Sequence, residues 1–85
     1  MKFFVYLIIA KRKKSYISYV GYTNNLKKRI KLHNLSKGAK FTKGNNWSLI
    51  YAKSYDTKRI AMSEEYKLKK NVKLRSKLKK KYLNR

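Results

Sequence analysis

Residues 16–34, YISYVGYTNNLKKRIKLHN, bring together several side chains that could do chemistry beyond carrying charge. The stretch contains three tyrosines, one glycine and the only histidine of the 85-residue chain. Arg29 lies four residues before His33, so the two side chains are neighbours if the stretch is helical. A guanidinium binds phosphate or carboxylate oxygens through planar, paired hydrogen bonds. The stretch therefore indicates a site for an anionic group.

Glu64 and Glu65 are adjacent, and on a helix they point about 100° apart, so they cannot act as a pair on one substrate. Ala61, Leu68 and Val72 project within about 60° of Glu65, which places this residue in the apolar stripe and Glu64 at its edge. A carboxylate on a buried face requires compensation. Two partners remain open: a lysine in a salt bridge, or a hard metal ion such as Mg²⁺, bound through one carboxylate plus waters and substrate phosphate.

Several other kinds of site are excluded by composition. The chain has no cysteine and one histidine, so it offers neither a disulfide nor a thiolate or histidine metal cluster. It also lacks a glycine-rich phosphate loop.

The charge of the chain points to a polyanionic partner. Lysine and arginine number 25 against 3 acidic residues, a formal net charge of +22. An AT-rich genome favours lysine over arginine, but it would write glutamate as readily, so codon bias does not account for the missing acids. Nucleic acid is the expected partner.

A membrane is the competing polyanion. The opening MKFFVYLIIA resembles the start of a signal peptide, but its apolar run is too short to span a bilayer, and basic residues follow where a cleavage site would lie. We expect a buried strand there, no membrane partner, and a cytoplasmic, unsecreted protein.

The elements that must position these side chains begin with two strands, over residues 3–10 and 16–22, which most simply pair antiparallel around the turn KRKKS. Gly21 ends the second strand, where a glycine indicates close approach of a backbone or ligand. Thr23 or Asn24 is expected to cap a helix that runs to about residue 35.

A polar loop, SKGAKFTKGNN, leads to a third strand over residues 47–55. Asp56 or Thr57 then caps a helix to about residue 71, and a final helix covers residues 74–83. The expected fold is a single α/β (α+β) domain, residues 1–85, with a small three-stranded antiparallel sheet flanked by helices in the order β-β-α-β-α-α.

These residues resemble the GIY-YIG nuclease superfamily. The matching motifs are VYL around Tyr6, YVG at residues 19–21, Arg29, His33 with Asn34, and Glu65, within the strings YVGYTNNLKKRIKLHN, KGAKFT and AMSEEYKLK. The first motif lacks its leading glycine. The chain looks most like the small stand-alone bacterial members and the catalytic module of structure-selective junction nucleases, from residue 3 to about 78.

For the two paired strands, the resemblance implies that Tyr6 and Tyr19 line a cleft, with Tyr6 activating the water. Gly21 would let the backbone approach the scissile phosphate. A tyrosine titrates near 10, so a tyrosine base needs local positive charge to lower its pKa, and this chain has such charge in excess.

For the helices, the resemblance implies that Arg29 stabilises the pentavalent phosphate and His33 orients water or phosphate. Glu65 would be the single protein ligand of Mg²⁺ or Mn²⁺. Phosphodiester hydrolysis needs a positioned water, a proton acceptor and positive charge on the developing phosphorane oxygens. These residue types supply each of them.

The expected function is metal-dependent DNA endonuclease activity, either structure-selective (branched, flap or nicked DNA) or directed by a targeting protein, in DNA repair or recombination. The alternatives are a basic nucleic-acid-binding protein of ribosomal type and a degenerate nuclease fold kept for binding. The residues expected to contact DNA are Tyr22, Lys27, Lys28, Lys40, Thr42 and Lys43.

Overall fold

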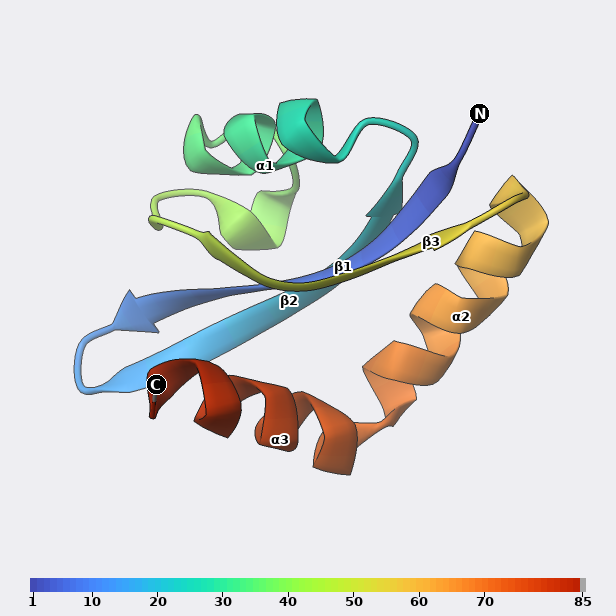
Figure 1. Ribbon diagram of the computed structural model, residues 1–85. Coiled ribbons are helices and arrows are strands. Elements are labelled where there is room, and N and C mark those ends of the chain that lie inside the picture. The colour runs from blue at the N-terminus through green and yellow to red at the C-terminus, as the bar shows by residue number, and fades with distance from the viewer. Residues whose placement is uncertain (85) are drawn as a thin grey trace.

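Three antiparallel strands form the centre of the molecule, in the spatial order β2-β1-β3 (Figure 1). The computed structural model describes residues 1–84. β1 is central because Val5 to Ala10 is a continuous apolar run whose six residues are all buried, as expected of a strand covered on both faces. The strands are β1 (Phe3–Arg12), β2 (Ser15–Thr23) and β3 (Ser48–Tyr55).

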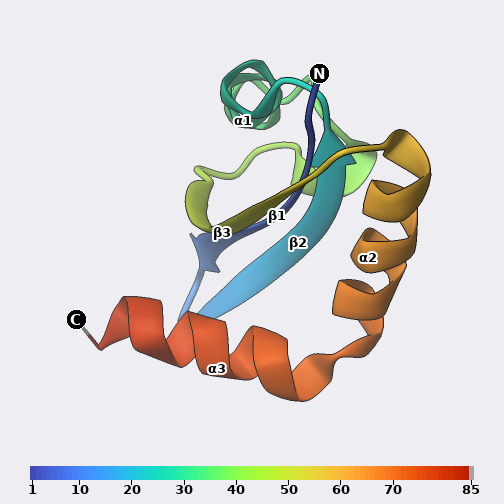
Figure 2. The same ribbon diagram turned by 45° about the vertical axis from the view of Figure 1, so that its right-hand side comes forward.

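Helices cover both faces of this sheet (Figures 1 and 2). One face carries a helix and a short 3₁₀ turn, α1 (Leu26–Asn34) and η1 (Lys40–Thr42). The other carries two longer helices, α2 (Lys58–Lys70) and α3 (Val72–Leu83). The predicted fold class and element order, β-β-α-β-α-α, are confirmed.

The alternation of side chains along β1 divides the core in two. Toward α2 and α3, the buried cluster consists of Val5, Leu7, Val20, Ala61 and Leu68. Toward α1, it consists of Tyr6, Ile8, Ala10 and Trp47. Tyr6 thus belongs to the α1 face, and Glu65, on α2, approaches from the opposite side of the sheet.

The helix starts differ from the expectation at α1 and agree with it at α2. Neither Thr23 nor Asn24 caps α1: the side-chain oxygen of Asn25 accepts the N–H of Lys28 at 3.1 Å. Thr23 instead accepts the backbone N–H of Asn25 through its hydroxyl. At α2, Thr57 is the cap, as one of the two expected candidates.

The apolar stripe expected along α2 is shorter than its periodicity indicated. The helix ends at Lys70, and Asn71 caps α3 by accepting the N–H of Leu74 at 3.0 Å. Val72 therefore starts a new helix and is 63% exposed, so it does not share a buried stripe with Glu65. Among residues 1–84, no helix is both long enough and apolar enough to cross a membrane.

Candidate active site

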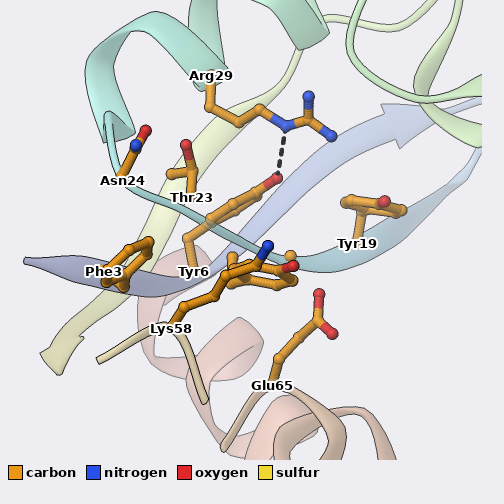
Figure 3. Close-up of a pocket in the computed structure, with 10 residues that line it drawn as sticks. Phe3, Tyr6, Tyr19, Thr23, Asn24, Arg29, Lys58 and Glu65 are labelled. Atoms are coloured by element: carbon orange, nitrogen blue, oxygen red, sulfur yellow. Dashed lines mark hydrogen bonds between the residues drawn. The ribbon is translucent and has the colours of Figure 1, made fainter. Parts of the chain in front are cut away.

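A cleft of about 500 Å³ lies along the edge strand β2, between α1 on one face of the sheet and α2 on the other. Figure 3 shows Arg29 on one side of Tyr6 and Glu65 on the other, with Tyr19 beside them. Four of the expected catalytic residues are thereby brought together. The cleft is lined by Phe3, Tyr6, Tyr19, Gly21, Tyr22, Thr23, Asn24, Arg29, Lys58 and Glu65.

Gly21 makes room for the side chain of Tyr6. The two residues are directly opposite each other in the β1–β2 ladder, and a Cβ atom at position 21 would overlap the phenol hydroxyl of Tyr6. Glycine at position 21 is therefore required by the packing of the Tyr6 side chain, whereas the sequence indicated close approach of a backbone or ligand. Its approach to a phosphate remains a prediction, supported by its place in the cleft wall.

The hydroxyl of Tyr6 is the point where two α1 side chains meet. Arg29 donates an Nε–H to it at 3.4 Å, the contact drawn in Figure 3. His33, one turn further along α1, lies with Nε2 at 2.7 Å from the same oxygen. The four-residue spacing on α1 therefore places a cation and an imidazole on one phenol.

The buried contacts of Thr42 fix which ring nitrogen of His33 carries the proton. Thr42 donates its only hydroxyl proton to the carbonyl oxygen of Ala39, at 2.8 Å. Its oxygen also lies 2.9 Å from Nδ1 of His33. That second contact therefore has the histidine as donor. Nε2 is then left unprotonated, and it accepts the O–H of Tyr6.

Burial sets the titration of both members of this pair. Burial, reinforced by the charge of Arg29, lowers the pKa of His33, so the ring is neutral at pH 7. Burial raises the pKa of Tyr6, and Arg29 offsets this only in part. The expectation that surplus positive charge lowers the pKa of this tyrosine is wrong for this structure, because desolvation of the phenolate outweighs the nearby guanidinium.

Two expected contacts with DNA or water are excluded by burial. Thr42 is fully buried, so it cannot touch DNA, and its hydroxyl serves His33 instead. His33 is also fully buried and, unlike the equally buried Tyr6, does not line the cleft. It reaches the cleft wall only through its hydrogen bond to Tyr6.

Residues outside the predicted set hold this buried pair in place. A Cβ at Gly38 would overlap the His33 ring. Trp47 donates its indole N–H to the carbonyl of Thr42 at 2.8 Å, and Asn34 accepts the backbone N–H of Trp47 at 2.6 Å. Asn34 belonged to a recognised motif, and Trp47 is the only tryptophan, but neither signal revealed this role.

Tyr19 lies beside the hydrogen-bonded pair of Tyr6 and His33 and is not a member of it. It is opposite Ile8 in the ladder, and its ring meets the His33 ring edge-on, with centroids 5.2 Å apart. Its side chain forms part of the cleft wall.

The two glutamates lie in different places, as the helical periodicity predicted. Glu65 lines the cleft with Tyr6 and Arg29, and its side chain is 17% exposed and 3.6 Å from Lys69. Glu64 is 31% exposed, pairs with Lys67 at 3.0 Å, and lines a separate cavity. The lysine pairing left open for Glu65 is present, and the carboxylate still borders the cleft.

Comparison with known proteins identifies the family. The model of the GIY-YIG catalytic domain matches residues 2–82. The chain belongs to the GIY-YIG family. This is a nuclease family, and the resemblance seen in the sequence is confirmed.

Relatives of this GIY-YIG chain carry the name UPF0213. The chain is 57% identical over 53 residues to UPF0213 protein YazA of Bacillus subtilis, covering 61% of this chain and 54% of the relative. It is 51% identical over 53 residues to UPF0213 protein CPE1444 of Clostridium perfringens, covering 61% and 57%. The match thus spans little more than half the length of these curated relatives.

A solved structure is also similar: the solution NMR structure of UPF0213 protein BH0048 from Bacillus halodurans. It is 37% identical, with 81% of this chain and 71% of that chain covered and a TM-score of 0.43.

Lys58 is a cleft residue of this GIY-YIG domain that the sequence reading missed. It is the first residue of α2 and borders the cleft with Glu65. The signal was present: Lys58 precedes Glu65 by seven residues, which is two turns and therefore the same helix face. Phe3, Thr23 and Asn24 also line the cleft without having been predicted.

The remaining residues expected to contact DNA differ in exposure, and of these only Tyr22 lines the cleft of this GIY-YIG domain. Lys27, Lys28, Lys40 and Lys43 are exposed. Tyr22 is half-buried: it lines the cleft and also packs against the core on the α2 face. Both readings of Tyr22, ligand contact and packing, are therefore compatible with its position.

The donor set of the cleft fits a hard divalent cation. Among residues 1–84 no cluster of three or more His, Cys, Asp or Glu side chains could enclose a metal. Mg²⁺ commonly binds through one or two carboxylates, completing its shell with waters and substrate phosphates. Glu65, a single carboxylate on the wall of an open cleft, is a suitable protein ligand of that kind.

Proposed function

We propose that this protein is a metal-dependent endonuclease that hydrolyses DNA phosphodiester bonds in the β2-edge cleft. One observation carries the proposal: Tyr6, Arg29 and Glu65, from three different elements, border one open cleft in a chain of net charge +22. A proton acceptor, a guanidinium and a carboxylate are the groups that phosphodiester hydrolysis requires.

The hydrogen bonds around Tyr6 support a proton relay. As water attacks the phosphate, the Tyr6 oxygen accepts a proton from the water and passes its own proton to Nε2 of His33. The histidine is neutral and has this nitrogen free, since Nδ1–H is held by Thr42. A relay of this form replaces a free phenolate at Tyr6 by an imidazolium at His33, and because burial also lowers the pKa of His33 the ring holds this proton only transiently. Tyr6 is then the catalytic residue, and His33 acts through it.

Arg29 is suited to stabilise the charge that develops on the phosphate oxygens. Its Nε–H is occupied by Tyr6, and the guanidinium also lines the cleft. The remaining donors of the planar group can make paired contacts to non-bridging oxygens. A contact directed at charge that appears only in the transition state increases the reaction rate and adds little to the affinity for the substrate.

A divalent ion held by Glu65, Mg²⁺ or Mn²⁺, would polarise the phosphate and the leaving oxygen. Lys69, which pairs with this carboxylate at 3.6 Å, is half-exposed and free to turn away. Lys58, on the same wall, can neutralise a further phosphate oxygen.

We infer that the substrate is branched, flap or nicked DNA recognised by its shape, or DNA presented by a targeting protein, in repair or recombination. Phosphate contacts from lysines give affinity without sequence information, and lysine is the dominant charged residue of this chain. This composition supports recognition of DNA by shape and not by sequence.

The test is cleavage of plasmid, flap and four-way-junction DNA with Mg²⁺, Mn²⁺ or EDTA. Cutting that requires the metal, is lost in Glu65→Gln and is retained in Glu64→Gln is the expected outcome. Glu64 is the matched control because it is the adjacent carboxylate on the same helix but lies outside the cleft. Binding in EDTA with no cutting under any metal would instead identify a basic nucleic-acid-binding protein.

A further inference from the structure

A second groove adjoins the cleft on the far side of Tyr19. It has a volume of about 260 Å³ and is lined by Ser18, Tyr19, Val20, Phe41, Lys69 and Arg75. Tyr19 lines both cavities. The two cavities therefore lie next to each other at the β2 edge of the sheet.

Phe41 is exposed and yet fixed in position. Its side chain is 51% exposed, and its ring stacks on Tyr19 with centroids 6.1 Å apart and planes at 20°. Trp47 supports it from another direction, at 6.4 Å. The next residue, Thr42, is buried and bonded to His33 and to the indole of Trp47. A half-exposed ring held in one orientation loses little conformational entropy when it binds a ligand.

The groove carries positive charge beside this ring. Lys69 and Arg75 line it, and none of its lining residues is acidic. Arg75 is held by hydrogen bonds from Nε to the carbonyl of Leu68 and from a terminal nitrogen to that of Lys69. An aromatic platform next to two cations matches a nucleotide, with its flat base and charged phosphate, better than it matches an apolar peptide.

We propose that this groove binds an unpaired nucleobase of the DNA strand that is cut, stacked on Phe41, with Lys69 and Arg75 contacting its backbone phosphates. The inference rests on the proposed nuclease function and specifies its substrate. A paired base is stacked within the duplex and must leave it to reach a protein ring. The groove therefore favours DNA in which unpaired nucleotides lie next to the scissile phosphate.

The experiment measures binding in EDTA, so that it does not depend on cleavage. Two DNAs of equal length are compared: a fully paired duplex, and a duplex with a single-stranded extension that carries 2-aminopurine at successive unpaired positions. The variants are Phe41→Leu, which removes the ring, and Phe41→Tyr, which keeps it. Tyr66→Leu is the matched control, because Tyr66 is an exposed aromatic side chain, 61% exposed, that lies on α2 and lines neither cavity.

We expect 2-aminopurine at one unpaired position to be quenched by the wild-type protein, by Phe41→Tyr and by Tyr66→Leu, but not by Phe41→Leu. Loss of a base-stacking ring should weaken binding of the extended DNA about fivefold or more and leave binding of the paired duplex unchanged. Thermal melting of each variant checks that the fold is retained.

If Phe41→Leu does not fold, 2-aminopurine quenching by the wild-type protein alone still tests the inference. Binding of the extended DNA without quenching at any unpaired position would overturn the inference, as would an equal loss on both DNAs in Phe41→Leu. In either case DNA binding itself survives, so the proposed function stands. Failure of the wild-type protein to bind either DNA would overturn the nuclease proposal and this inference together.

Discussion

At the scale of single residues, the site depends on three side chains that share one oxygen atom. The hydroxyl of Tyr6 accepts a hydrogen bond from Arg29 and donates one to His33, whose other nitrogen donates a hydrogen bond to Thr42. Each donor and acceptor of this buried chain has a partner, and a buried polar group left without one costs about 1–3 kcal/mol. The same contacts that stabilise the α1 face also orient the phenol toward the cleft.

Replacing Arg29 by alanine should reduce the cleavage rate about 10²–10³-fold and change DNA affinity little. One arginine is a small part of a net charge of +22, but in the proposed mechanism it contacts the phosphate that reacts. Arg29→Lys should recover little activity, because an ammonium lacks the planar fork. Single-turnover cleavage beside equilibrium binding separates the two effects, with Lys31→Ala, an exposed α1 substitution, as the control. Equal losses in rate and affinity would make Arg29 an ordinary phosphate contact.

The buried His33 should make folding stability depend on pH in a narrow window. Its pKa in the folded state lies below the unfolded value of 6.5. Below about pH 6.5 the unfolded chain therefore binds a proton that the folded chain does not. Stability is complete above that pH and decreases as the pH falls, by at most about 1.4 kcal/mol per pH unit, until the folded pKa is reached.

Urea unfolding between about pH 5 and 7.5 measures this effect, and a His33 variant isolates the contribution of the imidazole because the chain has one histidine. His33→Gln should be less stable and should lose the pH dependence over this range. A wild-type protein whose stability is flat there, or rises as the pH falls, would contradict the lowered pKa.

At the scale of elements, the 3₁₀ turn η1 acts as a support for α1. Its Thr42 hydroxyl is held by the carbonyl and N–H of Ala39, and its backbone carbonyl by Trp47. The turn can therefore present one lone pair to His33 in a fixed direction. The loop between α1 and β3, which sequence alone marks only as polar and glycine-containing, is a structural part of the site.

Thr42→Val should reduce stability by about 1–3 kcal/mol, because it leaves the Nδ1–H of His33 buried without an acceptor. It should also lower the cleavage rate, since the ring can then take the tautomer that no longer accepts from Tyr6. Thr42→Ser keeps the hydroxyl and should restore the rate, though it loses a buried methyl group. Chemical denaturation and single-turnover cleavage of both variants provide the measurement. If Val and Ser variants cut equally well, Thr42 only fills space.

At the scale of the whole molecule, the cleft exists because β2 is an edge strand. α1 covers one face of the sheet and α2 the other (Figure 2), and at this edge residues from both faces border the same space (Figure 3). Arg29 and Glu65 thus border the same cleft from opposite sides of the sheet. The chain as a whole carries 25 basic residues against 3 acidic ones, and one of the acidic residues, Glu65, lies in the cleft.

DNA binding should therefore decrease steeply with salt concentration. If the protein neutralises about six phosphates, its affinity falls about 10³-fold between roughly 50 and 200 mM salt, with a log–log slope near −0.9 per phosphate. Fluorescence anisotropy over this range, in EDTA, gives the slope. A flat dependence would remove the electrostatic basis of the nucleic-acid proposal.

The sequence by itself determined the features that depend on neighbouring positions in the chain. The apolar run of β1, the antiparallel pairing of two close strands, the order of elements and a helix cap at Asp56 or Thr57 follow from local periodicity and capping chemistry. The separation of Glu65 from Glu64 also follows, because a turn of about 100° per residue is a local property of any helix.

Only the tertiary structure decided how far each side chain is buried and what it contacts. Tyr6 and His33 are 27 residues apart, and Trp47 bonds to Thr42 across a loop. No local pattern specifies such pairings. Burial of His33 and Thr42, the raised pKa of Tyr6 and the overlap that requires glycine at position 21 all arise when α1 and η1 pack on the sheet. Desolvation and close contact are properties of the packed molecule, and they act on residues that the sequence keeps far apart.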